Sequence, residues 1–200
     1  KRNIKIESDY FPDVKCSNHL AVQIAASGPD TDWANIMEVM FTAIVTSEKY
    51  VYITTPYFIP NNQIITAMQV ASKSGVEVKL LIPKISDSWT AKHATNSYLE
   101  SLMEANIKVY RYTKGFIHTK TIVIDDMFST IGTTNMDYRS FNINFEINAM
   151  IYDKEKSIEL KSHFLKDLED SEEVDLERWK NRSQFQKIKE SYSRLWSPLL

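Results

Sequence analysis

The stretch GFIHTKTIVIDDMFSTIGTTN (115–135) contains two strand-like runs joined by a short polar turn and closed by a glycine. So short a connection predicts two antiparallel neighbours in a sheet. Side chains alternate between the faces of a strand, so His118 and Lys120 point the same way and Asp125 points the other way. The stretch therefore predicts two ionisable side chains next to each other on one face, where a strand begins.

Strand-like and helix-like segments alternate before this stretch. Expected strands are 20–27, 50–55, 76–83 and 107–112, and expected helices are 33–49 (capped by Asp32), 61–75 and 88–105. This alternation is typical of α/β proteins with a largely parallel sheet. Three further strand-like segments, 116–125, 127–134 and 143–153, have short connections and predict antiparallel pairing. We expect an α/β fold with a mixed, mostly parallel sheet flanked by helices on both faces.

The C-terminal quarter reads as helical. Residues 153–171 predict an amphipathic helix that turns four apolar residues inward: Ile158, Phe164, Leu165 and Leu168. From about Val174 a charged, helix-prone tail carries Trp179, Phe185 and Trp196. This tail fits a membrane surface or a protein partner equally well. We expect one domain over 1–200, with a core at about 20–172 and a helical extension at about 173–200.

Composition excludes some classes of protein. The net charge of −2 and the lack of a basic stripe disfavour a nucleic-acid binder. The single cysteine, Cys16, rules out an internal disulfide, and we expect it to be a small apolar residue of the interior. No apolar stretch approaches the 18 residues of a spanning helix. No cluster of acidic, histidine or cysteine residues suggests a metal site.

The pair His118 and Lys120 suits phosphoryl chemistry. A buried ammonium needs an anion or another hydrogen-bonding partner, and a neighbouring cation favours the neutral, nucleophilic imidazole. The lysine would hold a phosphate oxygen while the imidazole attacks phosphorus. Glu146, a carboxylate inside an apolar strand, is the natural acceptor for the other imidazole proton. Thr133 and Asn135, after the glycine turn, can donate to phosphate oxygens.

HTKTIVIDDMFSTIGTTN resembles the HxKxxxxD…GSxN signature of the phospholipase D superfamily. The stretches QIAASGPD, VYITTPYFIPN, MDYRSFNINFEINAMIYD and SRLWSPLL resemble the second half of bacterial cardiolipin synthases. The resemblance covers residues 20–200 and implies a phospholipase D-like fold. One departure is Thr133, where the family usually has serine.

The resemblance also implies roles for these residues. His118 would be the nucleophile that forms a phosphohistidine, Lys120 and Asn135 would bind phosphate, and Glu146 would orient His118. Asp125 belongs to the catalytic signature, although strand alternation places it on the other face as a structural member. We expect no metal and no cofactor, because Lys120 and Asn135 supply the charge and the donors.

One half-site is incomplete, because the leaving alcohol also needs an acid. His19, His93 and His163 are not in an H-x-K motif, and we expect ordinary structural roles for them. The second histidine would come from an N-terminal half, which the start without Met suggests is absent here, or from a second copy. Self-pairing would resemble the homodimers of single-motif relatives.

The sequence thus predicts phosphatidyl transfer between two phosphatidylglycerol molecules, giving cardiolipin and glycerol. The alternatives are a homodimeric phosphodiesterase or nuclease, and a non-catalytic scaffold. The parent protein is expected at the cell membrane, with phospholipid as partner, and this fragment by itself is expected to be soluble. Tyr57 and Phe58 either line the mouth of the site or anchor a loop, and Arg139 either meets a lipid phosphate or is a solvated surface residue.

Overall fold

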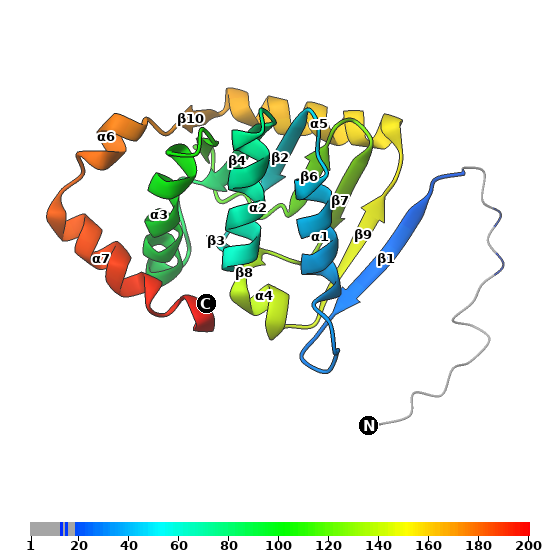
Figure 1. The fold of residues 1–200 in the computed structure, drawn as a ribbon, viewed down its shortest axis with the longest axis horizontal. Coiled ribbons are helices and arrows are strands. Elements are labelled where there is room, and N and C mark those ends of the chain that lie inside the picture. The colour runs from blue at the N-terminus through cyan, green and yellow to red at the C-terminus, as the bar shows by residue number, and fades with distance from the viewer. Residues whose placement is uncertain (1–12, 14, 16–18) are drawn as a thin grey trace.

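The computed structural model describes residues 13, 15 and 19–200, and Cys16 lies outside them. Within this part, eight strands form the central sheet in the order β1-β9-β7-β6-β2-β4-β5-β10 (Figure 1). Their bounds are β1 (Val22–Ser27), β2 (Tyr50–Thr54), β4 (Glu77–Pro83), β5 (Lys108–Tyr112), β6 (Thr121–Ile124), β7 (Phe128–Gly132), β9 (Glu146–Ile151) and β10 (Ser171–Glu173). Two short strands, β3 (Phe58–Ile59) and β8 (Met136–Asp137), pair separately.

The mixed α/β fold is confirmed, but the expectation of a mostly parallel sheet is wrong. Only β2–β4 and β4–β5 are parallel among the described neighbours of the large sheet. The other five pairs are antiparallel. Hairpin-length connections force β6 and β7 to run in opposite directions, and β1 joins β9 at the edge of the sheet instead of a strand nearby in sequence.

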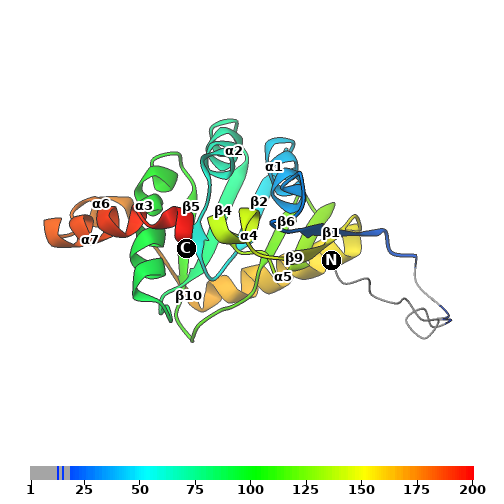
Figure 2. The same ribbon diagram turned by 90° about the horizontal axis from the view of Figure 1, so that it is seen from below.

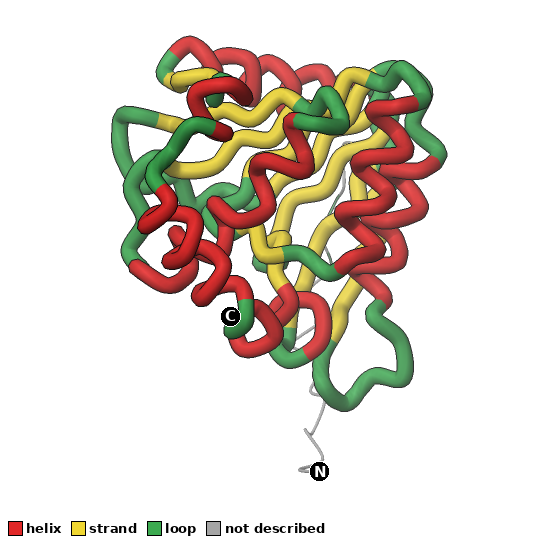
Figure 3. The backbone as a smooth tube through the Cα atoms, turned by 60° about the vertical axis from the view of Figure 1, so that its left-hand side comes forward, coloured by secondary structure: helices red, strands yellow, loops and turns green. Residues whose placement is uncertain are grey.

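Helices cover both faces of the sheet, as expected. Figure 2 shows α1 (Asn35–Val45), α2 (Asn62–Lys73) and α3 (Trp89–Met103) on one side and α5 (Lys154–Glu169) on the other. Each of these faces carries its own apolar cluster. Strand β2 is buried along its whole length, because its alternate residues pack into both clusters. In Figure 3 the strands run as one layer between the helices.

Local signals gave most helix boundaries correctly. Asn61 and Ser88 cap α2 and α3 through their side chains, as Ser, Asn and Asp do at helix starts. Asp32 is not the cap of α1, which begins after Ala34 without a side-chain cap. On α5, Phe164 is buried, but Ile158 and Leu165 are exposed, so the expected inward face was too wide. None of the helices in the described part is both long and apolar enough to cross a bilayer.

The tail forms two separate helices, α6 (Leu176–Lys180) and α7 (Gln184–Arg194), followed by the 3₁₀ turn η2 (Ser197–Leu199). Ser183 caps the second helix. Helix α7 packs along α3, and η2 packs against the short helix α4 (Tyr138–Asn142). The C-terminus therefore lies beside α4 (Figure 1).

Candidate active site

The fold brings most of the predicted site residues to one end of the sheet, where strands β1 and β2 end and β6 and β9 begin. Thr121 pairs with Thr54 at the end of β2, and Glu146 pairs with Ser27 at the end of β1. Strands β3 and β8 pair in parallel, so the segment that follows β2 lies next to the segment that follows β7. Tyr57 and Asn135, the residues directly before these two strands, therefore lie close together.

His118 and Lys120 lie on an extended segment just before β6, and not within the strand. The His118 side chain is exposed, whereas Lys120 is half-buried. Lys120 Nζ lies 3.3 Å from both ring nitrogens of His118 and donates to its carbonyl oxygen at 2.9 Å. The predicted pair is thus formed, with the imidazole open to solvent.

Lys120 is partly desolvated and faces two carboxylates. Burial lowers the pKa of the Lys120 ammonium, and the nearby charges of Glu146 and Asp137 oppose that change. A half-buried cation with balancing anions on one side and solvent on the other can accept an anionic ligand from the open side. This geometry suits a phosphate next to His118.

Glu146 is almost fully buried at the start of β9. Its carboxylate accepts hydrogen bonds from the Thr133 hydroxyl and, at 3.3 Å, from the Asn144 amide. Among the described residues no hydrogen bond joins Glu146 to His118. The orienting role of Glu146 stays a prediction, and its observed hydrogen-bonding partner across the strands is Thr133.

Asn135 is half-buried, and its side-chain oxygen is buried without a hydrogen-bond partner. Next to it, Asp137 caps α4 by accepting from the Ser140 amide at 2.7 Å. Burial raises the pKa of the Asp137 carboxyl, and hydrogen bonds from Ser140 and Asn135 oppose the rise. Sequence reasoning missed Asp137 as part of the site. The available signal was an Asp directly before the short helix YRSFN.

The turn after β7 depends on a buried amide that the sequence analysis also missed. Asn148 Oδ1 accepts from the amide and the hydroxyl of Thr134, and its Nδ2 donates to Thr130. A Cβ at Gly132 would lie 2.3 Å from Asn148 Oδ1 and 2.4 Å from the Ile147 carbonyl oxygen. The glycine thus lets β7 approach β9 closely, and this approach places Thr133 at Glu146.

Two aromatic rings flank His118. The Phe116 ring centre lies 5.5 Å from that of His118, and Tyr57 approaches edge-on at 6.5 Å. The Tyr57 hydroxyl donates to Asp87, and burial together with that carboxylate raises the pKa of Tyr57 to about 12. Phe58 is fully buried in the core, so of the two roles expected for it, anchoring the loop is the one observed.

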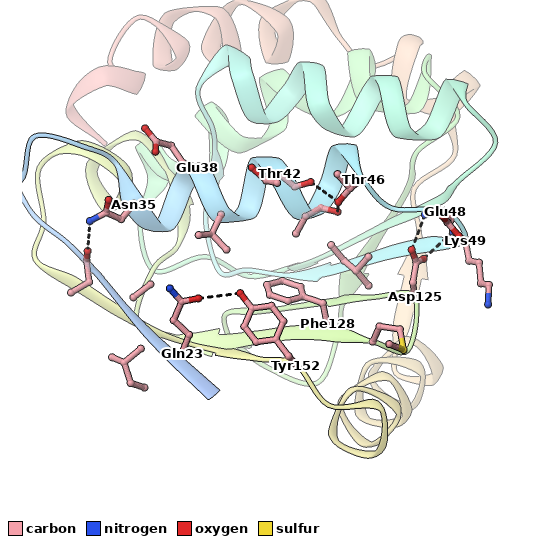
Figure 4. A pocket seen from close by; sticks show the side chains of 17 residues that line it. Gln23, Asn35, Glu38, Thr42, Thr46, Glu48, Lys49, Asp125, Phe128 and Tyr152 are labelled. Carbon is pink, nitrogen blue, oxygen red and sulfur yellow. Dashed lines mark hydrogen bonds between the residues drawn. The ribbon is translucent and has the colours of Figure 1, made fainter. Parts of the chain in front are cut away.

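Asp125 lies at the far end of β6, away from His118. Its carboxylate accepts from the backbone amides of Glu48 and Lys49 at 2.7 and 2.9 Å (Figure 4) and from that of Tyr50 at 2.8 Å. It also has a left-handed backbone, with φ of 55°. The contacts of Asp125 are therefore those of a structural residue, and none of them reaches His118 or Lys120.

The cavity next to Asp125 is separate from the candidate site. It measures about 900 Å³ and lies between α1 and strands β1 and β7, with Tyr152 at its edge (Figure 4). Apart from Asp125, none of the predicted site residues lines it.

The remaining candidates lie outside the cluster around His118. Arg139 is exposed, and its backbone amide donates to the Leu200 carbonyl. His93 is on α3, where its ring stacks edge-on to Trp89, and His163 is exposed on α5. His19 precedes β1 and is exposed. The described residues contain no group of three or more His, Cys, Asp or Glu side chains that could hold a metal ion.

Comparison with known proteins gives relatives over most of the chain. The chain is 44% identical over 179 residues to the cardiolipin synthase of Halalkalibacterium halodurans, covering 90% of this chain and 36% of the relative. It is 42% identical over 198 residues to the cardiolipin synthase of Staphylococcus aureus, covering 99% of this chain and 40% of the relative. The chain thus spans about two fifths of the length of these relatives.

Solved structures share the fold. Nuc from Salmonella typhimurium, a phospholipase D family member, has a TM-score of 0.67 at 20% identity, over 78% of this chain and 99% of that one. Phosphatidylserine synthase from Haemophilus influenzae has a TM-score of 0.70 at 16% identity, over 94% of this chain and 49% of that one. The family model described as the phospholipase D-like domain of cardiolipin synthase matches residues 40–168. Because that match spans more than half of the chain, the protein belongs to the family of cardiolipin synthase phospholipase D-like domains.

Proposed function

We propose that this chain supplies one half-site for phosphatidyl transfer between two phosphatidylglycerol molecules, with cardiolipin and glycerol as products. The observation that carries the proposal is the pair formed by the exposed His118 imidazole and the Lys120 ammonium, 3.3 Å apart. Lys120 faces Glu146 and Asp137 on its inner side and is open toward His118. The family membership supports the same reaction class.

In the proposed reaction, a ring nitrogen of His118 attacks the phosphorus of the first lipid. The P–N bond forms, the P–O bond to the glycerol headgroup breaks, and glycerol leaves with a proton from an acid. The hydroxyl of the second lipid then attacks phosphorus, loses its proton to a base and displaces His118. Lys120 and Asn135 bind the phosphate oxygens, because charged and neutral donors stabilise the negative charge of the transition state.

Glu146 would act on His118 through the residues around it. The carboxylate accepts from Thr133, so the threonine hydroxyl is held in place and its own oxygen accepts from the Ile147 amide at 3.0 Å. We propose that lipid binding draws His118 toward Glu146, which would then accept the proton of the non-attacking nitrogen. Tyr57 would line the mouth of the site, since its ring faces His118.

The acid that protonates glycerol would come from a second phospholipase D-like unit. His93 and His163 lie on helices away from His118, and this chain spans 49% of the phosphatidylserine synthase chain, which leaves room for a second unit there. An uncovered apolar sheet face also borders the site. Its exposed residues are Val22, Ile24, Ile131 and Ile147. A second unit that covers this face would bring its own histidine close to His118.

The test is hydrolysis of a chromogenic phosphodiester by the 200-residue chain across protein concentrations. His118→Ala is the inactive variant, and His163→Ala, on the exposed surface of α5, is the matched control. A rate that rises faster than linearly with concentration and disappears only in His118→Ala would show that two chains build one site. If the folded chain is silent, the same variants go into the longer protein with phosphatidylglycerol as substrate. A longer protein with His118→Ala that still forms cardiolipin would refute the proposal.

A second candidate is a homodimeric phosphodiesterase, including a nuclease. It is favoured by the fit to Nuc, of which this chain covers 99%. A nuclease of this kind would bind DNA with an affinity that falls steeply with salt. The net charge of −2 argues against such binding. Cleavage of a fluorescent oligonucleotide at 50 and 200 mM salt, with His118→Ala as control, separates it from the lipid reaction.

A further inference from the structure

Helix α7 buries its polar side and exposes its apolar side, the reverse of an ordinary surface helix. The side that faces the protein is polar: Glu190, Ser193 and Ser197, the last in η2, are all buried. The opposite side is apolar and open to solvent. A helix at a protein surface normally buries its apolar side and exposes its polar one. The inverted pattern indicates that the outer side of α7 is built to contact something else.

Polar contacts hold α7 in this orientation. Glu190 accepts from Arg182 at 2.9 Å, and Arg182 also donates to Glu100 on α3 at 2.6 Å. Tyr98 donates to the Ser197 hydroxyl at 3.0 Å. These buried contacts fix which side of the helix faces outward, because turning the helix would leave the Glu190 carboxylate unpaired.

The outer side forms a continuous apolar stripe. Spacings of three and four residues place its members on one side of the helix and its extension. The stripe consists of Phe185 (66% exposed), Ile188 (63%), Tyr192 (56%), Leu195 (77%), Trp196 (45%) and Leu199 (62%). Phenylalanine, tryptophan and leucine are the residues that interfacial helices insert among lipid headgroups.

The charges around the stripe are basic. Lys187, Lys189 and Arg194 belong to the same helix, and Lys189 Nζ lies 4.2 Å from the centre of the Phe185 ring. The one acidic residue of residues 183–200, Glu190, is buried against Arg182. This local excess of positive charge contrasts with the net charge of −2 for the whole chain. It is complementary to a negatively charged surface.

We propose that the apolar stripe of α7 and η2 docks on the surface of an anionic lipid bilayer. The inference rests on the proposed function, since it places the lipid substrate and the site on the same side. The turn η2 packs against α4, and the Arg139 amide of α4 donates to the Leu200 carbonyl. Helix α4 in turn is capped by Asp137, whose carboxylate charge acts on Lys120. The docked bilayer would therefore lie at the end of the sheet where His118 is exposed.

Exposed aromatic residues at the same end of the sheet support this placement. Trp33 follows β1, Trp89 follows β4, and Phe145 directly precedes β9, which begins opposite the end of β1. All three are more than half exposed. They would meet the headgroup region around the site once α7 is docked.

The experiment is co-sedimentation of the chain with vesicles of phosphatidylcholine alone and of phosphatidylcholine with phosphatidylglycerol. The double variant Ile188→Glu with Leu195→Glu should lose at least about tenfold in vesicle affinity, because each buried side chain contributes about a factor of ten. Val70→Glu, an exposed apolar residue on α2, is the matched control and should bind like the wild type. Circular dichroism confirms that each variant is folded.

A second pair of variants tests the charge. Lys187→Gln with Lys189→Gln should lose about fivefold or more in affinity for the anionic vesicles and nothing on phosphatidylcholine alone, since each basic residue near such a surface adds about that factor. Equal binding of the stripe variant and the wild type would overturn the proposal. A stripe variant that abolishes a concentration-dependent dimer, without any vesicle binding by the wild type, would assign the stripe to a second copy instead. Because sedimentation needs no turnover, it is repeated with His118→Ala, so loss of activity and loss of docking are distinguished.

Discussion

Removing the Asp125 carboxylate should unfold the protein at lower temperature without altering the residues around His118. In Asp125→Ala, the part-buried Tyr50 amide loses a charged acceptor, which costs about 2 kcal/mol. The Glu48 and Lys49 amides are exposed and regain water, at about 0.5 kcal/mol each. An alanine with the φ of 55° adds about 1 kcal/mol. We expect a loss of about 4 kcal/mol in the free energy of unfolding.

Thermal unfolding followed by circular dichroism measures this loss. A chain of 200 residues loses about 2 to 4 °C per kcal/mol, so Asp125→Ala should melt about 8 to 16 °C lower. Asp125→Asn keeps one acceptor oxygen and tolerates the left-handed backbone, so its loss should be about 3 to 6 °C. His118→Ala, at an exposed position, should melt within about 2 °C of the wild type. An Asp125→Ala protein with wild-type stability would refute the structural role.

Three further changes test the site. Gly132→Ala should cost about 3 kcal/mol in urea unfolding, because its Cβ meets the Ile147 carbonyl. In Gly28→Ala the Cβ meets two side chains that can move, the exposed Phe145 ring and the Asp30 carboxylate, so the cost should be less than about 1 kcal/mol; equal losses would contradict the close strand approach. Asn148→Ala leaves the amide and hydroxyl of Thr134 without their acceptor and should cost about 2 to 4 kcal/mol, and a loss below 1 kcal/mol would argue against the buried network. Burial lowers the folded-state pKa of Lys120, so the unfolded chain binds more protons between the folded and unfolded values and wild-type stability rises with pH there. Lys120→Met should lack that rise while losing activity; urea unfolding at pH 7 and pH 10 checks the sign, and a variant whose stability rises with pH as much as the wild type's would disprove it.

The sequence predicted individual strands and helices well because periodicity and capping are local. Asn61 and Ser88 act as caps where a polar residue precedes an apolar helical pattern. Which strands pair is decided by contacts far apart in the chain. The antiparallel pairing of β1 with β9 joins residues 119 to 129 positions apart, and no local pattern encodes it.

The candidate site was predicted only as a set of residue types. Asp125 was expected to point away from His118 by strand alternation, but the two residues lie beyond opposite ends of β6, and their separation follows from the length of the strand. The partner of Glu146 was not predictable, since Thr133 and His118 are both polar neighbours at the same edge and the choice depends on how closely β7 approaches β9. Asn148 was missed because a single amide in an apolar strand does not reveal what it satisfies. On α7 the periodicity gives a stripe, but only the buried Glu190 shows which side faces outward.

The central position of β2 has a consequence during synthesis of the chain. Its neighbours are β4 on one side and β6 on the other, and all five of its residues are buried in the finished fold. While the ribosome adds the 70 residues that follow Thr54, up to Ile124, the edge of β2 that later pairs with β6 has no partner. At about 5 to 20 residues per second, this interval lasts about 4 to 14 s. An unpaired apolar edge recruits other strands, so the nascent chain is most prone to aggregate in this interval, and a chaperone that binds it then should raise the yield of folded protein.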